Sequence, residues 1–288
     1  MSETHLVKGE KYKLTSFVEH HNSYSSNEDK KPRGGISCFI KSELIPFISE
    51  IRKDVTGHIR LKFTNGSVVF SSYIAPLDSP YADPMDFTNV ANTFYSSDEG
   101  SIIFGGGDLN GRVGDVPQTI TPFGGLYRKN CDHVLNEHGR EIIRICESFS
   151  CYVINNLNIH GKQFEGDFTF RKGNRTSQND IILANKTALT SIISFKIHKD
   201  GWNPSDHYPI SVKCCMTFTK SSTGLSASKD ILTERVKTAV DKPKKICKSD
   251  VDWKVYTELV KNDFKHYKNT VFSEYQVIKI SGHSVCGN

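Results

Sequence analysis

The amino-acid sequence predicts an α/β or α+β fold built as a sandwich of sheets with a few helices. Strand-like segments recur from residue 36 to residue 215, and segments with helical spacing are fewer. The dipeptide Asn65-Gly66 also separates two strand-like runs, which is a strong hairpin signal. Both kinds of secondary structure are therefore expected, with strands as the larger part.

The predicted strands are continuous or alternating apolar runs, the two patterns that buried and half-buried strands produce. In chain order they span residues 36–40, 60–63, 68–74, 102–105, 152–155, 180–183 and 209–215. Asn65 and Gly66 join the second and third of these as a hairpin, because both central positions of a type I′ turn require positive φ. Pro76 then ends the hairpin's second strand, since proline cannot donate a hydrogen bond to a ladder.

Two segments carry apolar residues at helical spacing. Residues 42–54 and residues 136–150 each place an apolar stripe along one side of a helix. We therefore expect two surface helices that each bury one face against the sheets.

The last quarter of the chain differs in composition from the rest. Residues 217–249 are rich in Ser, Thr and Lys and contain few large apolar residues, which is typical of a solvated linker. Beyond it, residues 253–267 show helical spacing again. We expect one globular domain in residues 1–216, a linker in residues 217–249, and an amphipathic helix with a tail in residues 250–288.

Composition excludes several classes of protein. At 288 residues, with 37% apolar and 24% charged residues, the chain is neither fibrous nor wholly disordered. Its longest apolar runs are far shorter than the roughly 20 residues that span a bilayer, so we expect a soluble, intracellular protein with no membrane partner. The net charge of +5 arises in residues 216–288, and therefore charge does not indicate nucleic-acid binding by the globular part.

The first chemically informative segment spans residues 102–114. It reads as an apolar strand that ends in three glycines and continues into Asp108-Leu109-Asn110. The end of a strand lies at the rim of its sheet, where Asp108 could accept a proton from water and Asn110 could hold an oxyanion.

The second segment is Ser205-Asp206-His207, directly before the predicted strand 209–215. This places His207 at a rim as well. A histidine needs a carboxylate to orient it and keep it charged before it can stabilise negative charge on a phosphate. Asp180, at the start of the predicted strand 180–183, is the candidate for that carboxylate.

Taken in order, these residues resemble the pattern of the endonuclease/exonuclease/phosphatase superfamily, which includes abasic-site endonucleases, DNase I-like enzymes and retrotransposon endonucleases. The matching positions are Glu3, Tyr73, Asp108 with Asn110, Asp180, and Asp206 with His207. Residues 2–6, 33–36 and 107–114 are most similar to the endonuclease of non-LTR (LINE-type) retrotransposons. The resemblance covers residues 2–213.

The resemblance implies a DNase I-like four-layer fold, a two-sheet β-sandwich flanked by helices. In that family a strand bearing an asparagine and a following helix precede the Glu segment, whereas this sequence begins two residues before Glu3. We therefore expect the first strand and helix to be lacking, and we hypothesise an incomplete, poorly stable and weakly active copy. Residues 250–288 would be the start of a connection to a missing reverse transcriptase.

The resemblance also implies a Mg²⁺-dependent phosphodiesterase, with Mn²⁺ as a second suitable ion, that nicks DNA in the nucleus. Glu3 and Asp206 would hold the metal. Asp108, with Asn110 beside it, would activate the attacking water. His207, held by Asp180, would contact the phosphate, and Tyr73 would donate a hydrogen bond to it.

Two other functions fit the same residues. The domain could be catalytically inactive and serve at most as an interaction module, although no protein partner is indicated. It could also act on another substrate, such as a small phosphoester or abasic DNA, because the motif concerns only the phosphate. Base preference would depend on the segments 76–92 and 171–179.

Overall fold

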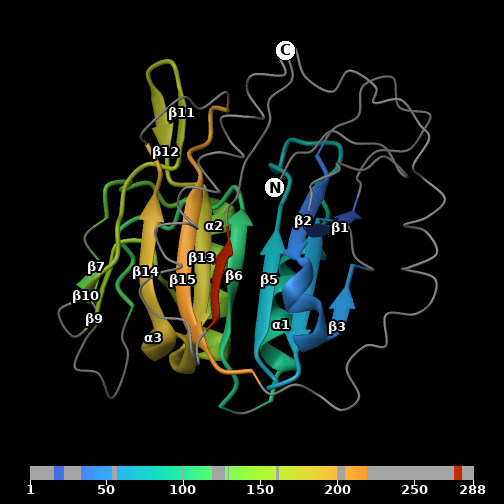
Figure 1. The fold of residues 1–288 in the computed structure, drawn as a ribbon. Coiled ribbons are helices and arrows are strands. Elements are labelled where there is room, and N and C mark those ends of the chain that lie inside the picture. Colours follow the sequence, from blue (N-terminus) through green and yellow to red (C-terminus); the bar gives the residue numbers. More distant parts are fainter. Residues whose placement is uncertain are drawn as a thin grey trace.

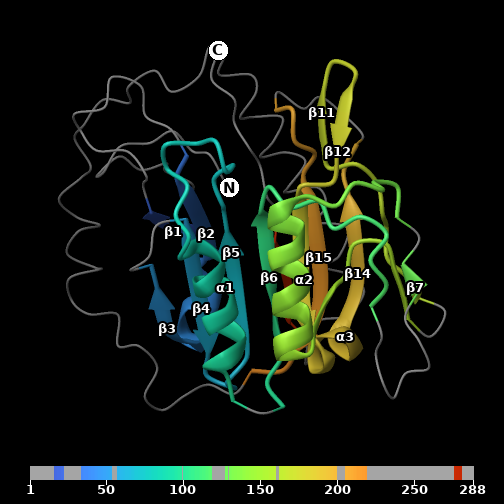
Figure 2. The same ribbon diagram turned by 180° about the vertical axis from the view of Figure 1, so that it is seen from behind.

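The computed structural model describes residues 16–22, 34–53, 57–98, 100–118, 127–128, 130–159, 162–199, 205–218 and 276–280. A six-stranded mixed sheet forms the middle layer. Helices α1 (Asp86–Tyr95) and α2 (Glu137–Phe149) cover one face of this sheet, and further strands cover the other (Figures 1 and 2). The predicted α/β sandwich is confirmed.

The six-stranded sheet has the order β3-β4-β5-β6-β13-β8. Its strands are β3 (Ile48–Arg52), β4 (His58–Phe63), β5 (Val68–Ser72), β6 (Ile103–Asp108), β13 (Asp180–Asn185) and β8 (Cys151–Val153). Strands β5 and β6 are parallel, and the other neighbouring pairs are antiparallel. Because β6 ends where β13 begins, Asp108 pairs directly with Asp180.

The facing layer contains two smaller sheets. One pairs β1 (Phe17–Asn22) with β2 (Ile36–Lys41), and the other has the order β14-β15-β16. The latter strands are β14 (Ile192–Ile197), β15 (Ile210–Met216) and β16 (Gln276–Ile280). The short helix α3 (Lys186–Ser191) links β13 to β14.

Short strands complete the described structure. Strands β7 (Tyr127–Arg128), β9 (Leu157–Ile159) and β10 (Lys162–Gln163) form one sheet. Strands β11 (Phe170–Lys172) and β12 (Arg175–Ser177) form a hairpin that stands beyond the end of the sandwich (Figure 1). This hairpin lies at the end of the molecule at which β6 finishes.

Two apolar cores hold the layers together. Phe104, Ile182 and Phe195 belong to the core between the two strand layers, and Phe70 and Ile142 belong to the core beneath the helices. Each of these side chains is almost completely buried, and burial of one such side chain stabilises the fold by about 1.5–3 kcal/mol. Because β13 contributes to both cores, its residues 181–184 form a continuous apolar run in the sequence.

The predicted helix 136–150 is confirmed as α2. The Asn136 side chain caps it by accepting a hydrogen bond of 2.8 Å from the Gly139 backbone N–H, and Ser150 ends it with a left-handed backbone. The predicted helix 42–54 is wrong. Residues Ser42–Phe47 form a 3₁₀ helix, η1, after which the chain pairs with β4 as strand β3.

The reason for the error lies in Pro46 and in the pairing with β4. Proline has no N–H for a continuing helix, and β-branched Ile48 and Ile51 suit a strand. Helix α1 is not among the predicted helices.

The predicted hairpin at Asn65 and Gly66 is confirmed as β4 and β5, but its turn is of another type. Only Gly66, at φ 81°, has positive φ. The Gly66 N–H donates to Phe63 O at 2.9 Å, and the Phe63 N–H donates to Ser67 O at 2.8 Å. These bonds describe a three-residue loop in which the glycine occupies the left-handed position.

Some predicted features lie outside the described residues, namely Glu3, residues 219–249 of the predicted linker and the predicted helix 253–267. Within the described residues, no helix combines the length and the apolar character needed to cross a membrane.

Candidate active site

The candidate site lies where β6 ends, β13 begins and the chain enters β15. Asp108 is the last residue of β6, Asp180 is the first residue of β13, and His207 lies three residues before β15. The sequence predicted each of these residues at the rim of a sheet. The structure brings the three side chains together, and each is at most 5% exposed.

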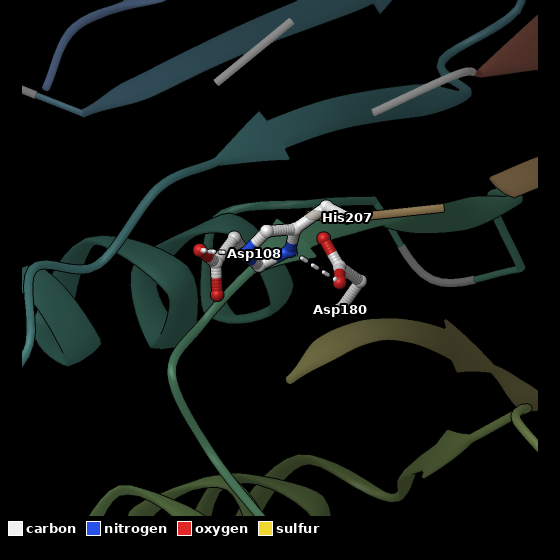
Figure 3. Close-up of side chains that lie close together, drawn as sticks. All are labelled: Asp108, Asp180 and His207. Atoms are coloured by element: carbon white, nitrogen blue, oxygen red, sulfur yellow. Dashed lines mark hydrogen bonds and ion pairs between the residues drawn. The ribbon is translucent and has the colours of Figure 1, made fainter. Parts of the chain in front are cut away.

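His207 lies between the two carboxylates (Figure 3). Its Nδ1–H donates to Asp180 Oδ2 at 2.9 Å, and its Nε2 lies 3.8 Å from Asp108 Oδ2. Asp180 therefore orients the ring, and Nε2 faces Asp108.

The segment that carries His207 is held in place by residues 169–171. The backbone N–H of Tyr208 donates to Thr169 O at 2.7 Å, and that of Arg171 donates to Asp206 O at 2.7 Å. The Phe170 ring also meets the His207 ring edge to face, with ring centroids 5.0 Å apart. Strand β11 therefore holds the histidine from one side.

Thr169 also fixes Asp180. Its hydroxyl oxygen accepts hydrogen bonds from the backbone N–H groups of Asn179, at 3.1 Å, and Asp180, at 3.0 Å. The side chain is completely buried, so neither N–H can bond to bulk water instead. Sequence reasoning assigned Thr169 no role, because its partners are ten and eleven residues away.

Asn110 forms the turn that follows Asp108. It has a left-handed backbone, at φ 47°, and its N–H donates to Asp108 Oδ1 at 3.1 Å. Its side-chain Nδ2 donates to Ile74 O at 2.9 Å, and the Ile74 N–H donates to Asp108 O at 2.9 Å. Asn110 thus ties the end of β6 to the segment after β5, and its expected contact with an oxyanion stays a prediction.

The other predicted site residues are Tyr73, Asp206 and Glu3. Tyr73 is 5% exposed and directly precedes Ile74, the residue bonded to Asp108. Asp206 Oδ2 lies 3.6 Å from the Lys172 ammonium, and the Asp206 side chain is 13% exposed. Glu3 lies outside the described residues.

Comparison with known proteins identifies the fold. Neither a protein-family model nor a curated protein matches the sequence. An AP endonuclease from Leishmania major is similar in structure, with a TM-score of 0.51 and 12% identity over 73% of this chain and 75% of that chain. The chain has the fold of this AP endonuclease. The predicted two-sheet sandwich with flanking helices is thus confirmed.

Two further solved structures are similar to this chain. A 3′ phosphatase from Neisseria bound to a product DNA hairpin has a TM-score of 0.49 and 13% identity, over 74% of this chain and 86% of that chain. The endonuclease domain of a telomere-specific non-LTR retrotransposon has a TM-score of 0.41 and 13% identity, over 66% of this chain and 77% of that chain.

The electrostatics of the site keep His207 charged. Burial alone would lower the pKa of the imidazole, but the Asp180 carboxylate, with further contributions from Asp108 and Asp206, raises that pKa to about 10. At neutral pH both ring nitrogens therefore carry protons. His207 is a hydrogen-bond donor and a cation, and it is not poised to act as a base.

This pKa shift predicts how stability depends on pH. The pKa of His207 is 6.5 when unperturbed and about 10 in the folded protein, so the folded state binds the extra proton between these values. The contribution of this proton to the free energy of unfolding is fully present below pH 6.5 and is lost as the pH rises through 10. Between these values the free energy of unfolding falls by at most about 1.4 kcal/mol per pH unit. Urea unfolding in metal-free buffer should show that His207→Gln removes this slope. Parallel curves for the two proteins would contradict it.

The donor groups of the site fit a hard cation through their oxygen atoms. Asp108, Asp180 and His207 offer ligand atoms that lie within 4.8 Å of one another. A doubly protonated histidine has no lone pair to give, so an ion that binds here without displacing a proton would use the carboxylates. Mg²⁺ prefers carboxylate oxygens and water, and therefore fits this set better than a nitrogen-preferring metal.

Proposed function

We propose that this chain is a metal-dependent phosphodiesterase that nicks DNA, of the kind that retrotransposons encode and that acts in the nucleus. One observation carries the proposal most strongly. His207 is held as a buried cation, with Nδ1 bonded to Asp180 and Nε2 directed towards Asp108. Such a pairing of a fixed proton donor with a carboxylate suits hydrolysis of an anionic ester.

The roles follow from the charges. A phosphodiester gains negative charge on its oxygens when water attacks, and the Nε2–H of His207 can donate to one of them. Asp180 keeps that proton in place. Asp108 is the carboxylate on the other side of His207, and it would orient the attacking water and accept its proton. Asn110 would support Asp108, and Tyr73 would donate to a phosphate oxygen.

We assign the metal to two of the carboxylates that the sequence pattern indicates. Asp206 and Glu3 would hold Mg²⁺, or Mn²⁺ in its place, together with water molecules. A bound divalent cation would polarise the phosphate and stabilise its charge.

A DNA substrate is supported by the hairpin beside the site. Arg171, Lys172 and Arg175 are exposed on β11 and β12, and the Arg171 N–H is bonded to the residue that precedes His207. Three cations on a projecting hairpin favour a polyanion that extends past the scissile phosphate. A small phosphoester would not reach them.

Plasmid relaxation tests the proposal. The full chain should convert supercoiled plasmid to the nicked form with Mg²⁺ and should fail to do so with EDTA. The His207→Ala protein, purified in parallel, should be inactive and so exclude a contaminating nuclease. Hydrolysis of a small phosphodiester without plasmid nicking would overturn the choice of DNA. A folded wild-type protein that cleaves neither substrate would favour the inactive interaction module.

A further inference from the structure

An ion pair with one buried and one partly exposed partner joins two of the segments that form the candidate site. Arg112 follows Asp108 by four residues, and its Nε and Nη2 donate to the two carboxylate oxygens of Asp132 at 2.8 and 2.6 Å. The Asp132 side chain is 3% exposed, whereas that of Arg112 is 29% exposed. This bidentate geometry fixes the orientation of both side chains.

Asp132 also bonds to the segment that leads into β13. Its Oδ2 accepts the backbone N–H of Gln178 at 2.9 Å, two residues before Asp180. The next carbonyl, that of Asn179, accepts the N–H of Leu109 at 3.1 Å. The segment before Asp180 is therefore bonded to Asp132 and to the residue after Asp108.

The Arg112 end of this connection is equally well fixed. The Asn136 side chain, which caps α2, accepts the Arg112 N–H at 2.8 Å and donates to Asn110 O at 2.9 Å. The Asn136 N–H donates to Arg112 O at 3.0 Å. Helix α2 thus anchors the turn from which Arg112 reaches Asp132.

The charge of Asp132 is kept in spite of its burial. Burial alone would raise the pKa of this carboxyl, but hydrogen bonds from Arg112 and from the backbone hold that pKa below its ordinary value. A buried carboxylate with several donors is rigid, because any movement leaves a donor or the charge unsatisfied.

We propose that Asp132, together with Arg112, is a positioning residue that sets the distance between Asp108 and Asp180 and so holds His207 in its reactive orientation. This inference rests on the proposed function. The side-chain hydrogen bonds of Asp132 reach Arg112, Val134 and Gln178 and not His207, so it acts through the segments 108–112 and 178–180. A residue that only stabilised the fold would leave the geometry of the folded site unchanged.

The test compares Asp132→Asn with Asp115→Asn in the full chain. Asp115 is 59% exposed and pairs with exposed His133, so it is a matched control from a nearby loop. For Asp132→Asn we expect kcat for plasmid nicking to fall about 10- to 100-fold with little change in KM, because small misplacements of catalytic groups have effects of this size. The ¹⁵N-coupled Nδ1–H resonance of His207 should shift or broaden. Asp115→Asn should change neither quantity.

The outcomes separate this inference from the proposed function. A folded Asp132→Asn protein with wild-type kcat and an unchanged Nδ1–H resonance would overturn the inference, even if its Tm fell. If the wild type does not nick DNA, the proposed function fails, and the resonance alone then decides the positioning role. Should Asp132→Asn not fold, Arg112→Gln takes its place with the same two readouts, because Arg112 is the more exposed partner.

Discussion

Asp108→Asn is expected to lower the single-turnover rate of metal-dependent DNA nicking by about 10³-fold, within the range of roughly 10²–10⁴ that general base catalysis contributes. The substitution is nearly isosteric, and the amide oxygen can still accept the Asn110 N–H that Asp108 Oδ1 accepts now. A carboxamide cannot take a proton from water. It also removes the negative charge that lies 3.8 Å from His207 Nε2. The rate would be measured on plasmid at saturating protein.

A control substitution makes this expectation specific. Asp98→Asn removes a carboxylate that is 66% exposed and paired with Lys62, and that precedes the start of β6 whereas Asp108 is its last residue. It should leave the nicking rate within about twofold, as expected for a surface ion pair of little energetic weight. If Asp108→Asn kept more than a tenth of the wild-type rate, Asp108 would not be the base, and the assignment of the site would have to change.

The rim positions of Asp108, Asp180 and His207 could be predicted from sequence because each lies where an apolar run begins or ends, whereas their expected roles came from the family resemblance. Runs of this kind become strands, and strand ends meet at one rim of a sandwich. The groups that hold these residues could not be predicted in this way. The bonds by which Thr169 and Asp132 act on the site reach partners ten or more residues away, so local spacing cannot predict them.

A helix or strand could be predicted where residues close together in the sequence are enough to determine it. Helix α2 combines an apolar stripe with the capping side chain of Asn136, so short-range information defines it. Residues 48–52 have the same kind of apolar spacing, but their pairing with β4 decides that they form a strand. Tertiary hydrogen bonding outweighed periodicity there, as is common for short apolar segments.

Gly106→Ala is expected to lower the free energy of unfolding by about 4 kcal/mol, from backbone strain and overpacking together. Gly106 has φ 151°, and a Cβ built on it would lie 1.9 Å from the carbonyl oxygen of Ile181 on β13. Backbone on that side cannot yield without breaking the ladder. For a domain of this size the melting temperature should fall by about 8–16 °C, which thermal unfolding followed by circular dichroism would measure.

Gly173→Ala is the matched control, because Gly173 also has positive φ, at 59°, but has no atom within 4 Å of the added Cβ. It should cost about 1 kcal/mol, the strain of a left-handed alanine without a clash. A similar loss of stability in both variants would show that strain, and not contact with Ile181, dominates.

Gly106→Ala should also affect the candidate site. The pairing that Gly106 permits is the pairing that sets Asp108 opposite Asp180. An alanine accommodated by a shift of β6 against β13 would therefore separate the two carboxylates, and nicking would be lost in the molecules that remain folded.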